Sequence, residues 1–167
     1  MLFRPQRHLT LANFHLRPGN QHAHAYALSL VQGSPRKYRS LLIVAGQSGR
    51  GKTHLVQAVA NYAKRNESID SSNILSAKQL ADAVHKGIYF DDLPLLDYQL
   101  RNCDFLAIDD VDQLTEENFL AGFLLEILQH RRSLGRVTLL SITLGFAPYK
   151  ASRLCEFLDR QMAVYLD

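Results

Sequence analysis

One eight-residue stretch constrains the fold of this chain more than any other feature. Residues 46–53 read Gly-Gln-Ser-Gly-Arg-Gly-Lys-Thr and fit the phosphate-binding loop pattern G-x-x-x-x-G-K-[ST] without a mismatch. The stretch lies between Leu41–Ala45, an apolar run of strand type, and His54–Lys64, which has helical periodicity. The alternative is a glycine-rich turn that matches the pattern by chance, and such a turn would not be expected between a strand and a helix. The strand, the loop and the helix together therefore predict a P-loop nucleotide site.

The chemistry of such a loop assigns roles to its residues. Glycines let the backbone curl so that several N–H groups point at one phosphate, and the following helix adds its positive N-terminal end. Lys52 would reach the β- and γ-phosphates, and Thr53 would hold Mg²⁺ through its hydroxyl. His54, on the helix, either contributes to the site or is structural. The other residues expected to contact the nucleotide are Gly46, Ser48, Gly49, Arg50 and Gly51.

Apolar segments and helical patterns alternate along the rest of the chain. We expect further strands near residues 73–77, 103–108, 137–142 and 162–166, and helices near 20–32, 77–85, 92–100, from 115 onward and near 149–158. This alternation predicts an α/β fold of P-loop NTPase type, a five-stranded parallel sheet sandwiched between helices. The 167 residues fit one domain, with an N-terminal arm and first helix over 1–39 and an α/β core over 40–167.

An acidic motif supplies the second half of the expected site. The apolar run Phe105–Ile108 is followed by Asp109 and Asp110, the pattern of a Walker B strand. Asp109 would bind Mg²⁺, and Asp110 would polarise the attacking water. The other interpretation, two acids that cap a helix after a strand, is less specific beside a complete phosphate loop. On the fourth strand, Ser141 or Thr143 would sense the γ-phosphate, although both also fit ordinary strand-end polarity.

Charge is unevenly divided along the chain. Residues 1–66 contain ten Lys or Arg and no acid, which leaves nine bases against sixteen acids, a net of −7, in the rest. The basic part would face nucleic acid, nucleotide phosphates or an acidic partner, unless the two parts interleave in the fold and neutralise each other. No apolar run reaches the roughly 20 residues that span a bilayer, so we expect no membrane partner. Cys103 and Cys155 lie in apolar surroundings, as core thiols in a reducing cytoplasm do.

Several stretches resemble one known family. Similarity to the start of the ATPase domain of DnaA, the bacterial replication initiator of the AAA+ class, is carried by Asn13–Asn20, Ala23–Ala25, Ser34-Pro35, Gly49–Leu55, Ala58 and Asn61-Tyr62. The Walker B region, with Arg101 ahead of it, is similar as well. The resemblance implies an AAA+ domain that binds ATP or ADP with Mg²⁺ and assembles with itself. It also implies that Phe14 and Asn20 lie near the base and the ribose.

The chain also departs from the pattern of that family. It stops after the fifth expected strand, so we expect neither a helical lid nor a C-terminal DNA-binding domain within it. The Asp-Arg pair that follows strand four in the family is absent from Ser141–Pro148. Ala151–Leu154 resembles the arginine-finger region of Hda, a short DnaA relative, which would make Arg153 catalytic towards a neighbouring subunit. Counting back from the last strand places Phe157 there instead, and Arg160 or a plain surface role for Arg153 are further alternatives.

These observations support three functions. The first is a DnaA-related protein of chromosome replication initiation or its regulation, a weak ATPase that docks through its nucleotide edge onto DnaA or another AAA+ replication protein. A sliding clamp, a helicase, single-stranded DNA or a second copy would be further partners. The alternative is a helicase loader or single-stranded-DNA-binding ATPase, with phosphate contacts from Arg36–Arg39. The third is a small-molecule kinase with Arg131-Arg132 near the acceptor, although no lid segment is evident.

Overall fold

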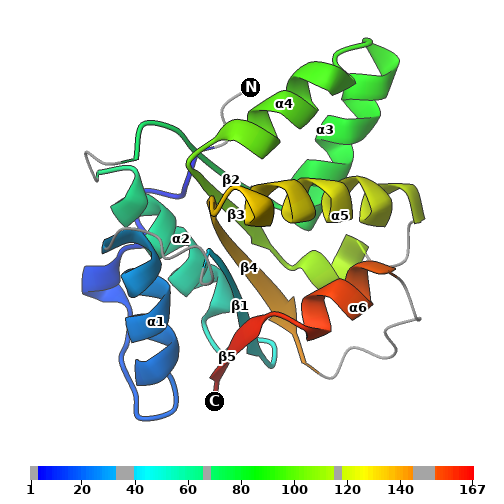
Figure 1. Ribbon diagram of the computed structural model, residues 1–167. Coiled ribbons are helices and arrows are strands. Elements are labelled where there is room, and N and C mark those ends of the chain that lie inside the picture. The colour runs from blue at the N-terminus through cyan, green and yellow to red at the C-terminus, as the bar shows by residue number, and fades with distance from the viewer. Residues whose placement is uncertain (1–3, 33–39, 66–68, 115–117, 145–152) are drawn as a thin grey trace.

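The structure is a computed structural model and describes residues 4–32, 40–65, 69–114, 118–144 and 153–167 (Figure 1). All strand pairings are parallel, in the order β2-β3-β4-β1-β5, which confirms the predicted five-stranded parallel sheet. The strands are β1 (Leu41–Gly46), β2 (Ser72–Ser76), β3 (Phe105–Asp109), β4 (Val137–Thr143) and β5 (Met162–Leu166). The helices are α1 (Gln21–Gln32), α2 (Lys52–Ala63), α3 (Ala77–Tyr89), α4 (Leu93–Asn102), α5 (Asn118–Ser133) and α6 (Arg153–Asp159), with 3-10 turns η1 (Leu11–Asn13) and η2 (Val111–Leu114).

Helices cover both faces of this sheet (Figure 1). Side chains alternate between the faces along each strand, so neighbouring residues of β1 enter different cores. Leu42 and Val44 pack in one apolar cluster with α1 and α2. Leu41 and Ile43 pack in the other, with α3, α4, α5 and α6. Because both faces are covered, β1 and β3 are buried at every position, as the continuous apolar runs in the sequence predict.

Several helix ends differ from the expected ones. α2 begins at Lys52, because Gly51 in a left-handed conformation (φ 91°) turns the loop into the helix. α3 begins after a capping box of Ser76 with Gln79 and continues to Tyr89, past the expected end near residue 85. The expected starts of the fifth and sixth helices, at residues 115 and 149, lie outside the described residues.

The N-terminal arm is hydrogen-bonded to the outer side of α2. Asn61 donates through Nδ2 to the carbonyl oxygens of Gln6 and Leu9, at 2.8 and 2.7 Å. The next part of the arm forms η1, where Thr10 and Asn13 make a capping box. The arm therefore follows α2 toward the phosphate loop and reaches it at Phe14.

The parallel sheet brings three segments together at one edge. The carboxyl ends of β1, β3 and β4 lie side by side, with Gly46 in register with Thr143. The phosphate loop leaves β1 at this edge, and Asp109 ends β3 there. Ligands of open parallel sheets bind beyond such ends. Among the helices in the described ranges, none has the length and apolarity that a bilayer crossing requires.

Candidate nucleotide site

The phosphate loop depends on two glycines whose backbones are left-handed. Gly49 has φ 78° and Gly51 has φ 91°, conformations that residues with a Cβ adopt only with strain. Gly46 has a different constraint, since a Cβ there would lie 2.8 Å from the carbonyl oxygen of Leu166 in β5. Ser48 and Arg50 are exposed on the turn between these glycines. Glycine thus shapes the loop at two positions and seats it against the sheet at a third.

Lys52 and Thr53 open α2 and face the loop differently. Lys52 is buried, and its Nζ donates to the carbonyl oxygen of Gln47 at 3.0 Å. That bond folds the ammonium group over the loop, and Lys52 also acts electrostatically on Asp110. Thr53 is exposed on the first turn of the helix. The loop and the acidic edge are therefore close enough for one cation to act on both.

Ser141 organises the acidic side of the site. Asp109 is buried at the end of β3, and the Ser141 hydroxyl donates to its Oδ1. The same hydroxyl accepts from the backbone N–H of Asp110 at 2.9 Å. Since Ser141 is fully buried and its single O–H is used, it fixes the two acids from behind. Its direct contact with a γ-phosphate stays a prediction, and Thr143 is tied through its N–H to Asp112 Oδ1 at 2.9 Å.

Asp110 is held in an unusual state. Its backbone is left-handed at φ 56°, a region that Asp and Asn tolerate better than most residues. Burial raises the pKa of its carboxyl, the charges of Asp109 and Asp112 raise it further, and Lys52 opposes them. A carboxylate with a raised pKa is a stronger base, so this position suits proton removal from water.

The residues at this edge fit Mg²⁺ bound together with a nucleotide. Mg²⁺ is usually held by one or two carboxylates and substrate phosphates rather than by a complete protein cage. Asp109 and the Thr53 hydroxyl supply oxygen donors of that kind. No cluster of three or more metal-binding side chains occurs within the described part of the chain.

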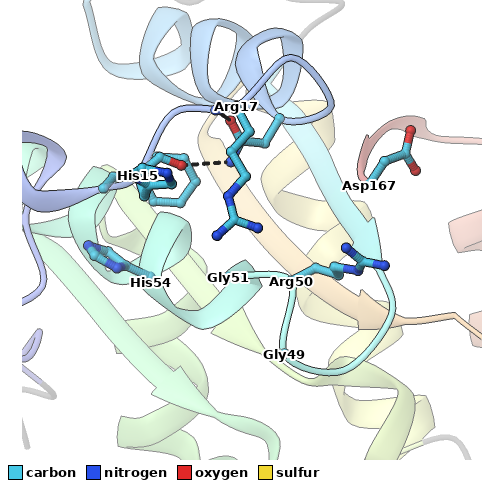
Figure 2. A pocket seen from close by; sticks show the side chains of 9 residues that line it. His15, Arg17, Gly49, Arg50, Gly51, His54 and Asp167 are labelled. Carbon is cyan, nitrogen blue, oxygen red and sulfur yellow. Dashed lines mark hydrogen bonds between the residues drawn. The ribbon is translucent and has the colours of Figure 1, made fainter.

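A pocket of about 140 Å³ opens on the outer side of the loop (Figure 2). Phe14 stacks on His24 with centroids 5.6 Å apart, and meets the edge of His54 at 5.2 Å. Phe14 also lies 3.6 Å from where a Cβ of Gly51 would be, so an aromatic wall touches the loop directly. The pocket is lined by Phe14, His15, Arg17, Asn20, Gly49, Arg50, Gly51, His54 and Asp167.

Asn20 and His54 shape this pocket through the backbone. Asn20 is buried; its Oδ1 accepts from the N–H of Arg17 at 2.8 Å, and its Nδ2 donates to the carbonyl oxygen of His15 at 3.0 Å. His54 Nε2 lies 3.1 Å from the carbonyl oxygen of Thr10 and therefore donates to it. Both side chains therefore hold the backbone of residues 10–17, which forms one side of the pocket, and both also line the pocket.

The proposed arginine finger lies apart from these residues. Arg153 is exposed at the start of α6 and forms no hydrogen bond or ion pair with other residues that the structure describes. Phe157, its alternative, packs against the core and lies under the guanidinium of Arg132, 5.9 Å from the ring centroid. Arg160 is exposed. Arg153 thus faces solvent, and its role as an arginine finger stays a prediction.

The structure corrects one expectation and adds residues that sequence reasoning missed. Arg131 cannot serve a kinase acceptor site, because it is fully buried and donates to the carbonyl oxygens of Leu100, Cys103 and Val137. Arg17 and its neighbour His15 line the pocket and were overlooked, although they lie in the segment assigned to base and ribose. Nothing in the sequence pointed to Asp167, which reaches the pocket only because β5 lies beside β1.

Two comparisons of the sequence with known proteins agree on one family. The family model of the bacterial DnaA ATPase domain matches residues 6–142. Chromosomal replication initiator protein DnaA of Nautilia profundicola is 34% identical over 121 residues, which is 68% of this chain. The chain spans only 26% of the length of that relative.

Solved structures share the fold. A structure of replication initiator DnaA bound to AMPPCP and single-stranded DNA matches 97% of this chain and 50% of its own, with a TM-score of 0.88 and 22% identity. The DnaC helicase loader matches 96% of this chain and 97% of its own, with a TM-score of 0.74 and 13% identity. Both have the α/β arrangement described above.

Proposed function

The chain belongs to the family of the bacterial DnaA ATPase domain, and on that premise we propose that it binds ATP or ADP with Mg²⁺ and acts in the initiation of chromosome replication or in its regulation. One observation supports this most: the phosphate loop, the paired acids and an aromatic pocket meet at one edge of the sheet. The solved DnaA structure bound to AMPPCP, an ATP analogue, supports the choice of adenine nucleotide. A cytoplasmic location is part of the same proposal.

Different residues at this edge of the sheet would bind different parts of the nucleotide. Loop N–H groups and Lys52 would bind the phosphates, Thr53 and Asp109 the metal, and the pocket around Phe14 the base and ribose. Mg²⁺, when bound, would neutralise charge on the phosphate oxygens. Asp110 would accept a proton from the attacking water, since its raised pKa favours that role.

Hydrolysis by the isolated chain would be slow. In related nucleotide hydrolases an arginine supplied by a second subunit contributes on the order of a thousandfold or more. Arg153 is exposed on α6 and would act in this way on a neighbour, while an AAA+ partner would dock at the nucleotide edge. That partner would be DnaA, another AAA+ replication protein or a second copy, and a sliding clamp or helicase would bind elsewhere.

Replacement of Lys52 tests the site itself. We expect Lys52→Ala to abolish ATP and ADP binding in calorimetry, because the ammonium group is the loop's point charge on phosphate. Circular dichroism should show an unchanged fold. Lys64→Ala, at the other end of α2 and exposed, is the matched control and should bind normally. Nucleotide affinity that survives in Lys52→Ala would disprove the site.

A second candidate function is a helicase loader or single-stranded-DNA-binding ATPase. The fold match to the DnaC helicase loader and the single-stranded DNA in the DnaA structure favour it. Arg36–Arg39, which prompted this alternative, lie outside the described residues. Exposed bases on the arm and after α2, namely Arg4, Arg7, Lys64 and Arg65, would provide the phosphate contacts.

A further inference from the structure

We infer that the pocket beside the loop accepts a nucleotide with an additional phosphate on its ribose, and that Arg17 and Arg50 bind this group. The inference rests on the proposed function, because it presupposes a nucleotide whose 5′-phosphates occupy the loop. The additional phosphate would bind away from the 5′-phosphates, at the end of the pocket where the ribose would lie between Phe14 and the loop.

Arg17 projects from a backbone that is fixed on both sides. Its N–H is held by Asn20 Oδ1 at 2.8 Å, and its carbonyl oxygen accepts from the N–H of Asn20 at 3.0 Å. Figure 2 shows the side chain extending from this turn toward Gly51. Because the backbone is held in place, little entropy is lost beyond that of the side chain when the guanidinium binds an anion.

Arg50 reaches the same space from the loop. It stands between two left-handed glycines, and its N–H donates to the carbonyl oxygen of Gln47 at 3.4 Å, which closes the turn. Both arginines line the pocket, one from each side. Two arginine side chains from different elements of the fold therefore line one pocket, Arg17 extending toward Gly51 and Arg50 extending from the loop toward the side on which Asp167 lies.

The two arginines have no carboxylate of their own. Ion pairs within the described part of the chain engage only Arg101 and Arg136 among the arginines. Asp167 is the single acid that lines the pocket, and no ion pair links it to either arginine. The side chains that line the pocket therefore carry one more positive than negative charge, two guanidinium groups against one carboxylate.

This positive charge is additional to what the 5′-phosphates need. Lys52 and the start of α2 serve the phosphate chain, and Lys52 does not line the pocket, because its Nζ is turned to Gln47. Ribose hydroxyls are neutral and would not balance this excess of positive side-chain charge. A phosphate group offers several acceptor oxygens to which guanidinium groups bind in bidentate fashion, and arginines mark 2′-phosphate sites in dinucleotide-binding folds by the same chemistry.

The test compares ADP with its 2′- and 3′-phosphorylated derivatives by calorimetry on the full chain. At least one derivative should bind roughly ten- to a hundredfold more tightly than ADP, as new charge-assisted hydrogen bonds require. In the double variant Arg17→Gln/Arg50→Gln the ratio of the affinities for the derivative and for ADP should fall to about one, and this ratio, rather than the affinity for ADP itself, is the readout. Arg7→Gln/Arg65→Gln, which removes the same charge from exposed positions outside the pocket, should keep the preference of the unaltered chain.

The outcomes separate the inference from the proposed function. If ADP binds in a Lys52-dependent way but neither derivative binds more tightly, the inference is wrong and the nucleotide site stands. A preference that persists in Arg17→Gln/Arg50→Gln would also overturn the assignment. Failure of ADP and both derivatives to bind the unaltered chain would overturn both proposals.

Discussion

At the scale of single residues, Asp110 has features that reduce the stability of the fold and that suit a general base. Its carboxyl is partly buried beside two other acids, and its backbone is left-handed. Both features are unfavourable for folding, and both suit the proposed role of Asp110 as a base toward the attacking water. Ser141 bonds to this pair from behind, and that bond offsets part of the cost.

The raised pKa of Asp110 should make the stability of the folded protein depend on pH. The pKa of Asp110 is raised above its ordinary 3.8 in the folded state, so its protonated form is favoured there. Its contribution is therefore fully favourable below that ordinary value and is lost as pH rises through the raised one. Asp110→Asn, which tolerates the same backbone, should raise the melting temperature at pH 7, and the gain should vanish below pH 3.8. The same variant should bind ATP and lose hydrolysis; a constant gain at all pH values would contradict this account.

Arg131 is a structural residue, although the kinase hypothesis placed it near an acceptor site. Its guanidinium joins the end of α4 to the start of β4 through carbonyl oxygens, and donates to Thr138 Oγ1 at 3.0 Å. Arg131→Met would leave several buried carbonyl groups without donors. We expect a loss of about 3 kcal/mol or more in the free energy of unfolding by urea. Arg132→Met, at the exposed next position, should cost less than about 1 kcal/mol, and similar losses for the two variants would argue against the role.

At the scale of elements, the arm and α2 form one unit. Three polar residues on one side of α2, His54, Gln57 and Asn61, hold the arm by hydrogen bonds. Their spacing of three and four residues places them along one helical face. Because the arm ends at Phe14, the far end of α2 is coupled to the wall of the nucleotide pocket.

Removal of the Asn61 amide tests this coupling. Asn61→Ala should free the carbonyl oxygens of Gln6 and Leu9, reduce stability by about 1–3 kcal/mol and speed hydrogen exchange along the arm. ADP affinity should fall as well, although Asn61 is a helix length away from the loop. Tyr62→Phe, on the exposed side of the same helix, should change neither quantity. If Asn61→Ala speeds hydrogen exchange along the arm but leaves ADP affinity unchanged, the arm is not coupled to the nucleotide site.

At the scale of the whole molecule, the charge asymmetry of the sequence becomes an asymmetry of faces. The arm, α1 and α2 come from the basic first 66 residues and cover one face of the sheet, whereas α3 to α6 cover the other. Exposed bases at Arg4, Arg7, Lys64 and Arg65 lie on the first face. The two parts interleave only within the sheet, where β1 lies between β4 and β5. Their helices lie on opposite faces, so the basic face remains available to an anionic partner.

This face discriminates the two candidate functions. If the chain is a single-strand binder, its affinity for an oligonucleotide should fall steeply with salt, and Arg7→Gln/Arg65→Gln should reduce the logarithmic slope by about 1–2. If it is a regulator that docks onto DnaA, pull-down of DnaA should depend on ATP against ADP and should weaken in Arg153→Ala. Weak, salt-independent DNA binding together with nucleotide-dependent DnaA capture would exclude the first.

The sequence by itself determined the local parts of this protein. Residues 46–53 specify a loop, and the apolar run before Asp109 specifies a buried strand. The alternation of strand-type and helix-type apolar patterns specifies a parallel α/β sheet. Each of these features depends only on residues that are neighbours along the chain. Strand order, the bonds of Ser141 to the acids, the burial of Arg131 and the arrival of Asp167 at the pocket were decided by tertiary structure. Each of these joins residues that are far apart in the chain, and no local pattern reports which distant segments the packing of two cores brings together.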